Sequence, residues 1–271
     1  MIFTDALGRT IELAAPPGRI VSLVPSITET LFALGLENEI VGVTNFCIHP
    51  HEKIKALPKV GRVKNLDVPC ILGLRPDLVI ANAEENSRED VEALAGAGIA
   101  VYVCFPRTVE AAISFVRDVG ALTGRQKAAA ELAGSIEREQ ALARACAAGR
   151  EPPRVFCAIW KNPYMSIGAD TYIHDLIRVS GGRNIFCERR ERYFATDMDE
   201  ICHLSPDIIL LPNEPYRFLR RDIAEFTGQE TIPATRSGRI HIVPGESAVW
   251  FGSRTAEGIR LLSKLFWPDG R

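Results

Sequence analysis

Two stretches of the chain repeat one pattern, and this repeat limits the possible folds more than any other feature of the sequence. The pattern Leu-x-Pro-Asp occurs at residues 74–77 and 204–207, with Pro76 and Pro206 standing 130 residues apart, and aliphatic residues follow both copies. Proline cannot continue a helix, and aliphatic runs are typical of buried parallel strands. Each copy therefore predicts a helix that ends and leads into a core strand, and the chain is predicted to have two similar lobes.

Polar side chains follow the predicted strand of each copy. Asn82 and Glu84 come after the first strand, and Asn213 and Tyr216 come after the second. Open α/β sheets usually bind ligands beyond the carboxyl ends of their strands. We therefore assign these four residues to a ligand cleft between two such sheet edges.

The bulk properties exclude several classes of partner. The 271 residues carry a formal net charge of −2 and a sequence pI near 6.3, which argues against binding to nucleic acid. No apolar run approaches the ~20 residues of a membrane span. No signal-peptide pattern opens the chain, so we expect a cytoplasmic protein if Met1 is the native start and an extracytoplasmic one if a signal has been removed. A monomer is expected.

The seven cysteines include no Cys-x-x-Cys pair. Several lie within apolar patterns, so most are predicted to be buried thiols rather than a disulfide or zinc framework, which suits a reducing compartment. Neither a metal site made of protein side chains alone nor a resident cofactor is predicted.

The order of predicted elements indicates an α/β fold whose first, doubly wound lobe covers residues 1–107. Ser26 and Glu29 have the spacing of a capping box, and Gly35 is placed to end the helix that this box begins. Strands are predicted at 19–24, 40–43, 78–81 and 99–104, with a helix at 88–95.

A helical segment over residues 108–150 is predicted to join this lobe to a second α/β lobe at 151–271. It contains helices at 108–121 and 125–148, and the second is the long backbone helix that connects the lobes. In the second lobe, strands are predicted at 155–159, 204–211 and 240–243, and helices at 171–179 and 256–266.

The succession of motifs resembles the helical-backbone family of substrate-binding proteins, which serve ABC importers of cobalamin, iron-siderophores and haem. The resemblance rests on residues 5–9, 19–26, 74–78, 181–186 and 205–208 in this order, and the block from Trp160 through His174 to Gly181-Gly182 is closest to the cobalamin-binding branch. It implies two lobes joined by a rigid helix, with cobalamin or another metal chelate held between them.

The resemblance also implies an acidic residue on each lobe, seven positions before the repeated proline, that docks on a permease. Counting back gives Asp199 in the second lobe but Pro69 in the first, where Asp67 is the nearest carboxylate. We assign Asp199 and Asp67 to permease docking, and the asymmetry makes docking less secure than ligand binding.

Aromatic residues supply the other candidate ligand contacts. Trp250, Phe251 and Arg254 stand where the family presents an aromatic face and an arginine to the ligand, with plain packing at a helix start as the alternative. Trp160 ends a predicted strand, where it could equally seal the core. His174 is predicted to be structural.

Two further segments carry candidates. Phe46 and His49 follow the strand at 40–43, and His49 beside Cys47 could offer a ligand to a soft metal or to the cobalt of a corrinoid. The pairs Tyr193 with Phe194 and Tyr216 with Phe218 are read as loop aromatics that need a partner surface.

We therefore predict a binding protein and not an enzyme. The phosphate-binding glycine loops and the Gly-x-Ser-x-Gly nucleophile motif are absent from the sequence. A cytoplasmic carrier or sensor of a corrinoid, working without a permease, remains the alternative.

Overall fold

A four-stranded parallel sheet forms the centre of the first half of the chain. Its strands are β3 (Ile20–Ser22), β4 (Ile40–Val43), β7 (Leu78–Asn82) and β8 (Ala100–Cys104), in the order β4-β3-β7-β8. Every residue of the two central strands, β3 and β7, is buried. This explains their unbroken aliphatic runs, because helices and loops cover both faces of a parallel sheet.

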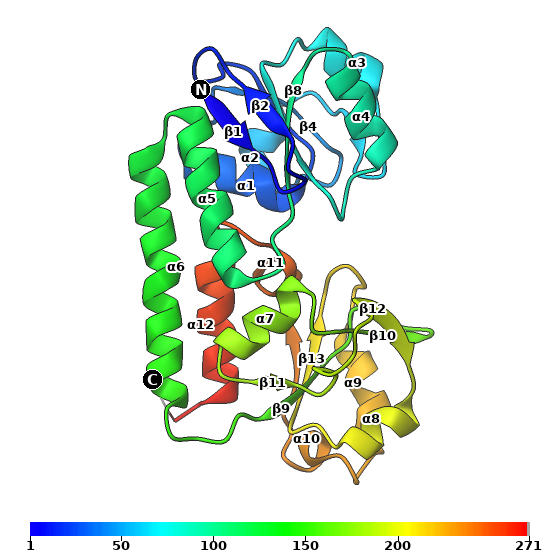
Figure 1. Cartoon of the computed structure of the whole chain (residues 1–271). Coiled ribbons are helices and arrows are strands. Elements are labelled where there is room, and N and C mark those ends of the chain that lie inside the picture. The colour runs from blue at the N-terminus through cyan, green and yellow to red at the C-terminus, as the bar shows by residue number, and fades with distance from the viewer. Residues whose placement is uncertain (270–271) are drawn as a thin grey trace. The chain divides into compact units, whose positions relative to one another are not determined.

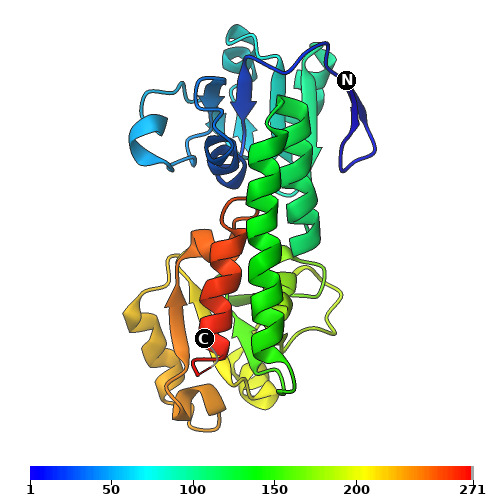
Figure 2. The same ribbon diagram turned by 90° about the vertical axis from the view of Figure 1, so that its left-hand side faces the viewer.

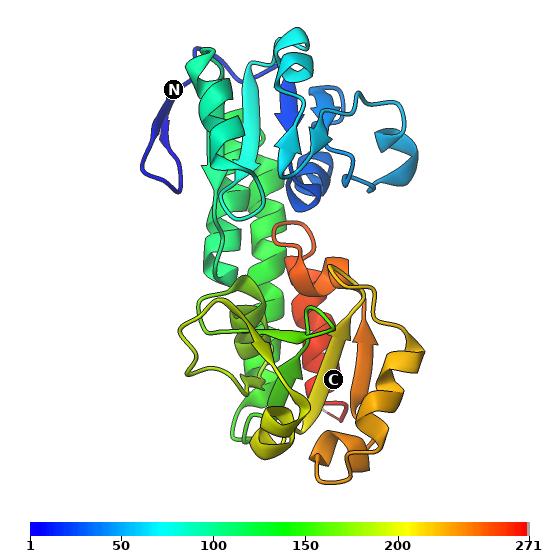
Figure 3. The same cartoon turned by 90° about the vertical axis from the view of Figure 1, so that its right-hand side faces the viewer.

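The second half of the chain repeats this arrangement. Its parallel sheet contains β9 (Arg154–Cys157), β11 (Arg183–Asn184), β13 (Ile208–Pro212) and β14 (Ile240–Val243), in the order β11-β9-β13-β14. Figure 3 shows β13 and β14 side by side, paired from Ile209 opposite Ile240 to Pro212 opposite Val243. Numbered along the chain, both sheets have the strand order 2-1-3-4. The predicted α/β class with two similar parallel sheets is therefore confirmed.

The computed structural model describes residues 1–269 and separates into two compact units. The first unit contains residues 1–106, 110–134 and 251–253, and the second contains 107–109, 135–250 and 254–269. Helix α5 (Val109–Thr123) lies almost wholly in the first unit, and α6 (Gln126–Ala147) has residues in both (Figure 1). The helical segment predicted at 108–150 is therefore divided between the units.

The repeated Leu-x-Pro-Asp segments have the same local structure. Helix α3 (Val68–Gly73) precedes the first copy and α8 (Met198–Leu204) the second, and the residue before each proline has a left-handed φ of 47°. Asp77 accepts the backbone N–H of Arg19 at 2.9 Å, and Asp207 accepts that of Arg154 at 2.8 Å. The repeat thus ends a helix and fixes the starts of two neighbouring strands, and the prediction of a helix leading into a core strand is confirmed twice.

Helix α1 (Pro25–Ala33) follows β3, but its start differs from the prediction. Val24 is the N-cap residue and no side chain caps it, so the capping box of Ser26 and Glu29 is wrong. Pro25 fits the first helical turn because its missing N–H would have no helical partner there. Gly35 follows the helix end with φ of 73°, which confirms its predicted place.

Helices cover the sheets. In the second unit, α12 (Thr255–Phe266) lies beside the later part of α6, where Arg260 pairs with Glu139 at 2.8 Å (Figure 2). The remaining helices are α2 (His51–Ile54), α4 (Arg88–Gly96), α7 (Tyr172–Val179), α9 (Arg220–Thr227), α10 (Pro233–Arg236) and α11 (Gly245–Val249).

Three two-stranded antiparallel sheets were not predicted. They are β1 (Ile2–Thr4) with β2 (Thr10–Glu12), β5 (Gly61–Arg62) with β6 (Asn65–Leu66), and β10 (Tyr164–Ile167) with β12 (Tyr193–Thr196). In the first, the Asp5 carboxylate accepts N–H groups of Leu7 and Arg9, the Arg9 guanidinium at 2.7 Å, and the N–H of Val103 in β8. The Asp5-to-Arg9 motif therefore attaches the hairpin to the edge of the first sheet.

The structure tests the predicted burial of the cysteines and the expectation that no segment spans a membrane. All seven cysteines are free, and three of them, Cys47, Cys104 and Cys157, are buried while four are half-buried, so the prediction that most are buried thiols is wrong. Among residues 1–269, no helix is long and apolar enough to cross a membrane.

Candidate functional site

The carboxyl edges of the two sheets are where ligand-binding side chains are expected. In a sheet of strand order 2-1-3-4, the first and third strands are neighbours, and the connections from them run in opposite directions. Such a point leaves a crevice outside the strand ends, which is the usual binding position in open α/β sheets. The relevant loops follow β3, β4 and β7 in the first unit, and β9 and β13 in the second.

The loop after β7 is organised by two buried asparagines. The Asn82 Oδ1 accepts the N–H groups of Glu84 at 2.8 Å and Glu85 at 3.1 Å, and Asn86 Oδ1 accepts the N–H of Asn82 at 2.8 Å. Asn82 is only 3% exposed. Its amide therefore shapes the loop, while the side chains of Glu84 and Glu85 are partly exposed.

The loop after β4 presents apolar side chains to solvent. Phe46 is 45% exposed, and the guanidinium carbon of Arg62 lies 5.6 Å from its ring centroid. Ile48 is 48% exposed, and His49 is half-buried two residues after the buried Cys47. This loop brings an aromatic face and an imidazole within four residues of chain, and Arg62 of β5 (Gly61–Arg62) adds a cation beside the ring.

Cys47 points away from this surface. Thr28 Oγ1 donates to its Sγ at 3.1 Å, and Thr44 Oγ1 lies 3.3 Å from it. Burial raises the pKa of the Cys47 thiol, so the thiolate needed for a metal bond is disfavoured. Among residues 1–269 no group of three or more metal-ligating side chains is found.

Aromatic residues gather after β9 and β13 in the second unit. Trp160 is 44% exposed, and its ring centroid lies 5.5 Å from that of Tyr216 in a T-shaped contact. Tyr216 in turn lies 4.7 Å from Phe218, which is 1% exposed and belongs to the core. Phe218 is therefore packing, and Trp160 with Tyr216 forms the accessible part. Asn213, directly after β13, is exposed, and its Oδ1 accepts the N–H of Gly245 at 2.7 Å.

An ionic network fixes the chain directly after Trp160. Lys161 Nζ lies 2.6 Å from Asp222 and 2.5 Å from Glu225, and Tyr164 Oη donates to Glu225 at 2.5 Å. The side chains of Lys161 and Asp222 are only 12% and 5% exposed. This network could not be found from the sequence, because its acidic members stand 61 and 64 residues after the lysine.

The charges in this network stabilise one another. Hydrogen bonds to Asp222 and Glu225 raise the pKa of Lys161. Burial alone would raise the pKa of Asp222, but the hydrogen bonds from Lys161 and from the Leu219 backbone outweigh it and lower that pKa. The hydrogen bond from Lys161 also lowers the pKa of Glu225. All three groups are therefore charged near neutral pH.

Tyr193 and Phe194 lie in strand β12 and not in a loop. Alternation along the strand turns Phe194 into the core at 8% exposed and Tyr193 outward at 38%. The reading of these residues as a pair of loop aromatics is therefore wrong. Arg192 lies 5.7 Å from the Tyr193 ring centroid, so Tyr193 remains a candidate with a neighbouring cation.

Trp250 and Phe251 are almost fully buried, at 6% and 5% exposed. Phe251 meets Phe115 edge to face at 5.2 Å within the first unit. Arg254 pairs with Glu257 at 2.8 Å in the second unit. Exposed aromatic side chains are found instead at Phe46, Trp160 and Tyr193. Ligand contact by Trp250, Phe251 and Arg254 stays a prediction.

His174 is half-buried on α7, and its Nδ1 lies 3.3 Å from the Asn184 side-chain amide. Burial lowers the pKa of His174, which fits the structural place predicted for it.

The two docking candidates occupy different positions of the repeat. Asp67 is the N-cap of α3 and accepts the N–H of Cys70 at 2.9 Å, as Asp197 caps α8 by accepting the N–H of Glu200 at 2.8 Å. Asp67 therefore corresponds to Asp197, while exposed Asp199 corresponds to Pro69. Both assigned carboxylates are exposed. Asp67 caps its helix, whereas Asp199 does not.

The chain has two α/β units, each built on a parallel sheet, with exposed aromatic and polar side chains after the strands. This arrangement is typical of ligand-binding proteins. The chain belongs to the periplasmic binding protein family, which matches residues 20–246. This confirms the family resemblance seen in the sequence motifs. Proteins of this family bind substrates and do not convert them, so the prediction that the chain is not an enzyme is also confirmed.

Three known proteins show the extent of the similarity. The uncharacterized ABC transporter substrate-binding lipoprotein YvrC of Bacillus subtilis (strain 168) is 29% identical over 278 residues, covering 98% of this chain and 85% of YvrC. The vitamin B12-binding protein of Salmonella typhimurium (strain LT2) is 28% identical over 207 residues, covering 76% of each. The apo structure of the periplasmic heme-binding protein RhuT from Roseiflexus sp. RS-1 has a TM-score of 0.80 at 26% identity, covering 93% of this chain and 99% of RhuT.

Proposed function

We propose that the chain captures a bulky, partly apolar metal chelate, a corrinoid of the cobalamin type, for an ABC importer. The observation that carries this proposal is the exposure of aromatic side chains: Phe46 at 45% and Trp160 at 44% follow strands of the two parallel sheets, and Tyr193 on β12 is 38% exposed. An exposed aromatic face gains free energy when a flat apolar ligand covers it. A macrocycle has the size and flatness to use such faces.

The relatives support the same class of ligand. One similar protein is named for vitamin B12 and another for haem, and both molecules are large rings around a metal ion. The corrinoid is proposed as the ligand because the motif block around Trp160 and His174 resembles the cobalamin-binding branch. Haem is the second candidate, supported by the 26% identity to RhuT.

Polar groups beside the aromatic faces would orient the ligand. Arg62 lies over Phe46, Tyr216 lies against Trp160, and Glu84 and Asn213 follow the third strand of each sheet. Amide or carboxylate groups on the edge of a macrocycle can hydrogen-bond to such side chains. His49, three residues after Phe46, is proposed to offer its imidazole to the metal.

Delivery to a permease outside the cytoplasm is proposed on the basis of the relatives. YvrC is named a lipoprotein of an ABC transporter, and RhuT is named periplasmic. Asp199 is the proposed principal docking carboxylate, since it is exposed in the first turn of α8, and Asp67 is proposed as the docking carboxylate of the first unit. A carrier or sensor without a permease would use the same ligand residues but neither carboxylate.

The test is to mix the purified protein with cobalamin, hemin and a ferric siderophore in turn and to pass each mixture through a sizing column. The colour of cobalamin is expected to elute with the protein. Trp160→Ala and Phe46→Ala are each expected to weaken binding about tenfold, the effect of losing one aromatic contact of ~1.5 kcal/mol. Leu142→Ala, which removes a side chain that is 55% exposed on α6, is the matched control and should bind as the wild type does.

Co-elution of hemin alone would replace the corrinoid by haem as the ligand. If none of the three colours elutes with the protein and calorimetry shows no heat for any of them, the macrocycle proposal is wrong. If cobalamin binds but Trp160→Ala and Phe46→Ala bind like Leu142→Ala, the ligand is correct and the assigned residues are not.

A further inference from the structure

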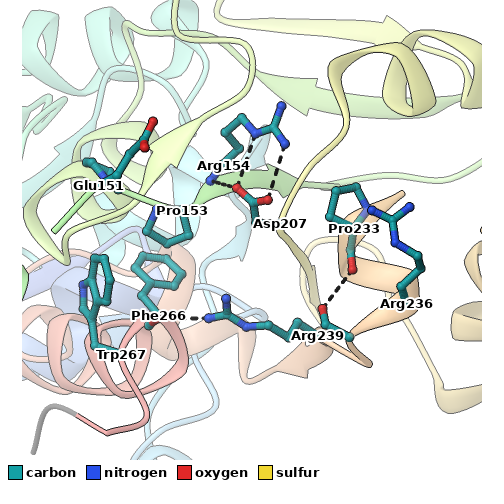
Figure 4. A pocket seen from close by; sticks show the side chains of 11 residues that line it. Glu151, Pro153, Arg154, Asp207, Pro233, Arg236, Arg239, Phe266 and Trp267 are labelled. Atoms are coloured by element: carbon teal, nitrogen blue, oxygen red, sulfur yellow. Dashed lines mark hydrogen bonds and ion pairs between the residues drawn. The ribbon is translucent and has the colours of Figure 1, made fainter. Parts of the chain in front are cut away.

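A pocket of about 770 Å³ lies at the amino-terminal edge of the second unit's sheet (Figure 4). Arg154 begins β9, Asp207 precedes β13 and Arg239 precedes β14, so the pocket opens where these strands start. Trp160 and Asn213 follow the opposite ends of β9 and β13. At ~3.3 Å per residue, the five residues of β13 place the pocket some 17 Å from that carboxyl edge.

Arginines dominate the charge of the pocket wall. Arg154 pairs with Asp207, with Nε at 3.3 Å from the carboxylate, so these two charges offset each other. Arg236 donates to the carbonyl oxygens of Glu230 and Thr231. Arg239 donates through Nη2 to the carbonyl oxygens of Leu265 and Phe266 at 2.8 and 3.0 Å.

Two of these guanidinium groups have no ion-pair partner in the described part of the wall, although the negative charge of Asp207 also acts on Arg239. Within residues 1–269, no carboxylate forms an ion pair with Arg236 or Arg239, and the remaining acidic residue of the wall is Glu151. Arg239 is half-buried, and burial lowers its pKa. A cation removed from water is costly unless an anion compensates it, and backbone carbonyls do so only partly.

The internal repeat shows that a sheet edge of this kind can be built without an arginine at the position of Arg239. Arg19 and Asp77 in the first unit correspond to Arg154 and Asp207 in the second, and both pairs fix strand starts in the same way. By strand register, Ala100 of the first unit corresponds to Arg239, since Val79 pairs with Val101 as Ile209 pairs with Ile240. The second unit has thus added a cation where the first has a methyl group.

We propose that this pocket binds the phosphate group of a small organic phosphate, with Arg236 and Arg239 donating to its oxygens. A phosphate carries about −1.5 to −2 charges at neutral pH, which matches two unpaired guanidinium groups better than a single carboxylate does. The volume leaves room for an organic body, and the indole of Trp267 lines the wall beside it. Arg150 lies 5.3 Å from the Trp267 ring centroid and holds that ring in place.

The experiment is calorimetric titration of the full chain with phenyl phosphate, inorganic phosphate and benzoate at matched ionic strength. Phenyl phosphate and inorganic phosphate are expected to bind saturably, phenyl phosphate more tightly, and benzoate weakly. Arg236→Gln and Arg239→Lys should each weaken binding at least about tenfold, since each loses charge-assisted hydrogen bonds. Lysine at position 239 keeps the charge near the end of α12, so the fold is retained.

Arg88→Gln is the control, because Arg88 is exposed on α4 of the first unit and its loss should leave binding unchanged. The quenching of tryptophan fluorescence by phenyl phosphate should fall in Trp267→Phe, which reports where the ligand lies. The proposal is overturned if neither phosphate binds saturably, if benzoate binds as tightly as phenyl phosphate, or if both arginine variants bind like the wild type.

Discussion

Replacing Lys161 by methionine tests the ionic network that holds the chain after Trp160. Methionine keeps the length and the apolar stem of the side chain but removes the ammonium group. The Asp222 carboxylate, 5% exposed, then loses its counter-charge, whereas Glu225, 45% exposed, regains water. Removing one partner of a fully buried pair costs 3–5 kcal/mol, so this partly exposed network should lose ~2–3 kcal/mol of unfolding free energy.

The assay is urea unfolding at pH 7 followed by tryptophan fluorescence. All three tryptophans, Trp160, Trp250 and Trp267, belong to the second unit, so the signal reports that unit alone. With a slope of about 2 kcal/mol per M urea, the midpoint should fall by about 1–1.5 M.

The pH of this assay lies where the whole network is charged. Because folding lowers the pKa values of Asp222 and Glu225, their contribution to the free energy of unfolding is present above their unfolded-state pKa of ~4. It is lost as the pH falls through their folded-state pKa. Because folding raises the pKa of Lys161, the contribution of this lysine to the free energy of unfolding is present below its unfolded-state pKa of ~10.4. It is lost as the pH rises through its folded-state pKa. The variant should therefore differ most from the wild type between these limits.

Two further variants make the test specific. Adding Asp222→Asn to Lys161→Met removes the uncompensated charge and should restore at least ~1 kcal/mol. Lys264→Met removes an exposed lysine of α12 in the same unit, and it should change the midpoint little. A Lys161→Met midpoint within 0.2 M of the wild type, or no recovery in the double variant, would refute the reasoning.

Three other predictions follow from burial. Trp250→Ala should lower the stability of the protein by ~3–5 kcal/mol in thermal unfolding, whereas Trp160→Ala, at an exposed position, should lower it by less than ~1 kcal/mol; equal losses would contradict the assigned burial. In the native protein at pH 8, a thiol reagent should modify the four half-buried cysteines quickly and the three buried ones slowly. The reason is that burial raises the pKa of the buried thiols, to about 12 for Cys157. Equal rates for all seven would contradict this. The lowered pKa of His174 means that protonation favours the unfolded state, so stability should fall as the pH drops below ~6.5. In urea midpoints measured from pH 7.5 to 5.5, the fall should be smaller for His174→Gln than for the wild type.

The candidate site was only partly predictable because local patterns do not report which face of a strand is outward. Phe46 and Trp160 follow predicted strands and are indeed exposed. Tyr193 and Phe194 looked equivalent in the sequence, but the unpredicted pairing of β10 with β12 turns one outward and one inward. Trp250 stands in a motif that promised an aromatic face, and the fold buries it.

Contacts between distant residues account for what else was missed. Lys161 meets Asp222 and Glu225 only because β9 and α9 come together, and no spacing rule connects them. The surroundings of Arg236 and Arg239 likewise come from other segments, namely the starts of strands and the end of α12.

The sequence by itself determined the two-unit α/β plan, seven of the eight strands of the two parallel sheets, and the family. These follow from local chemistry: proline ends a helix, aliphatic runs form buried strands, and the repeat shows that this happens twice. The tertiary structure alone decided which aromatic side chains reach solvent, which charges pair and where unpaired arginines gather. Those outcomes depend on packing between segments far apart in the chain, which a linear pattern does not contain.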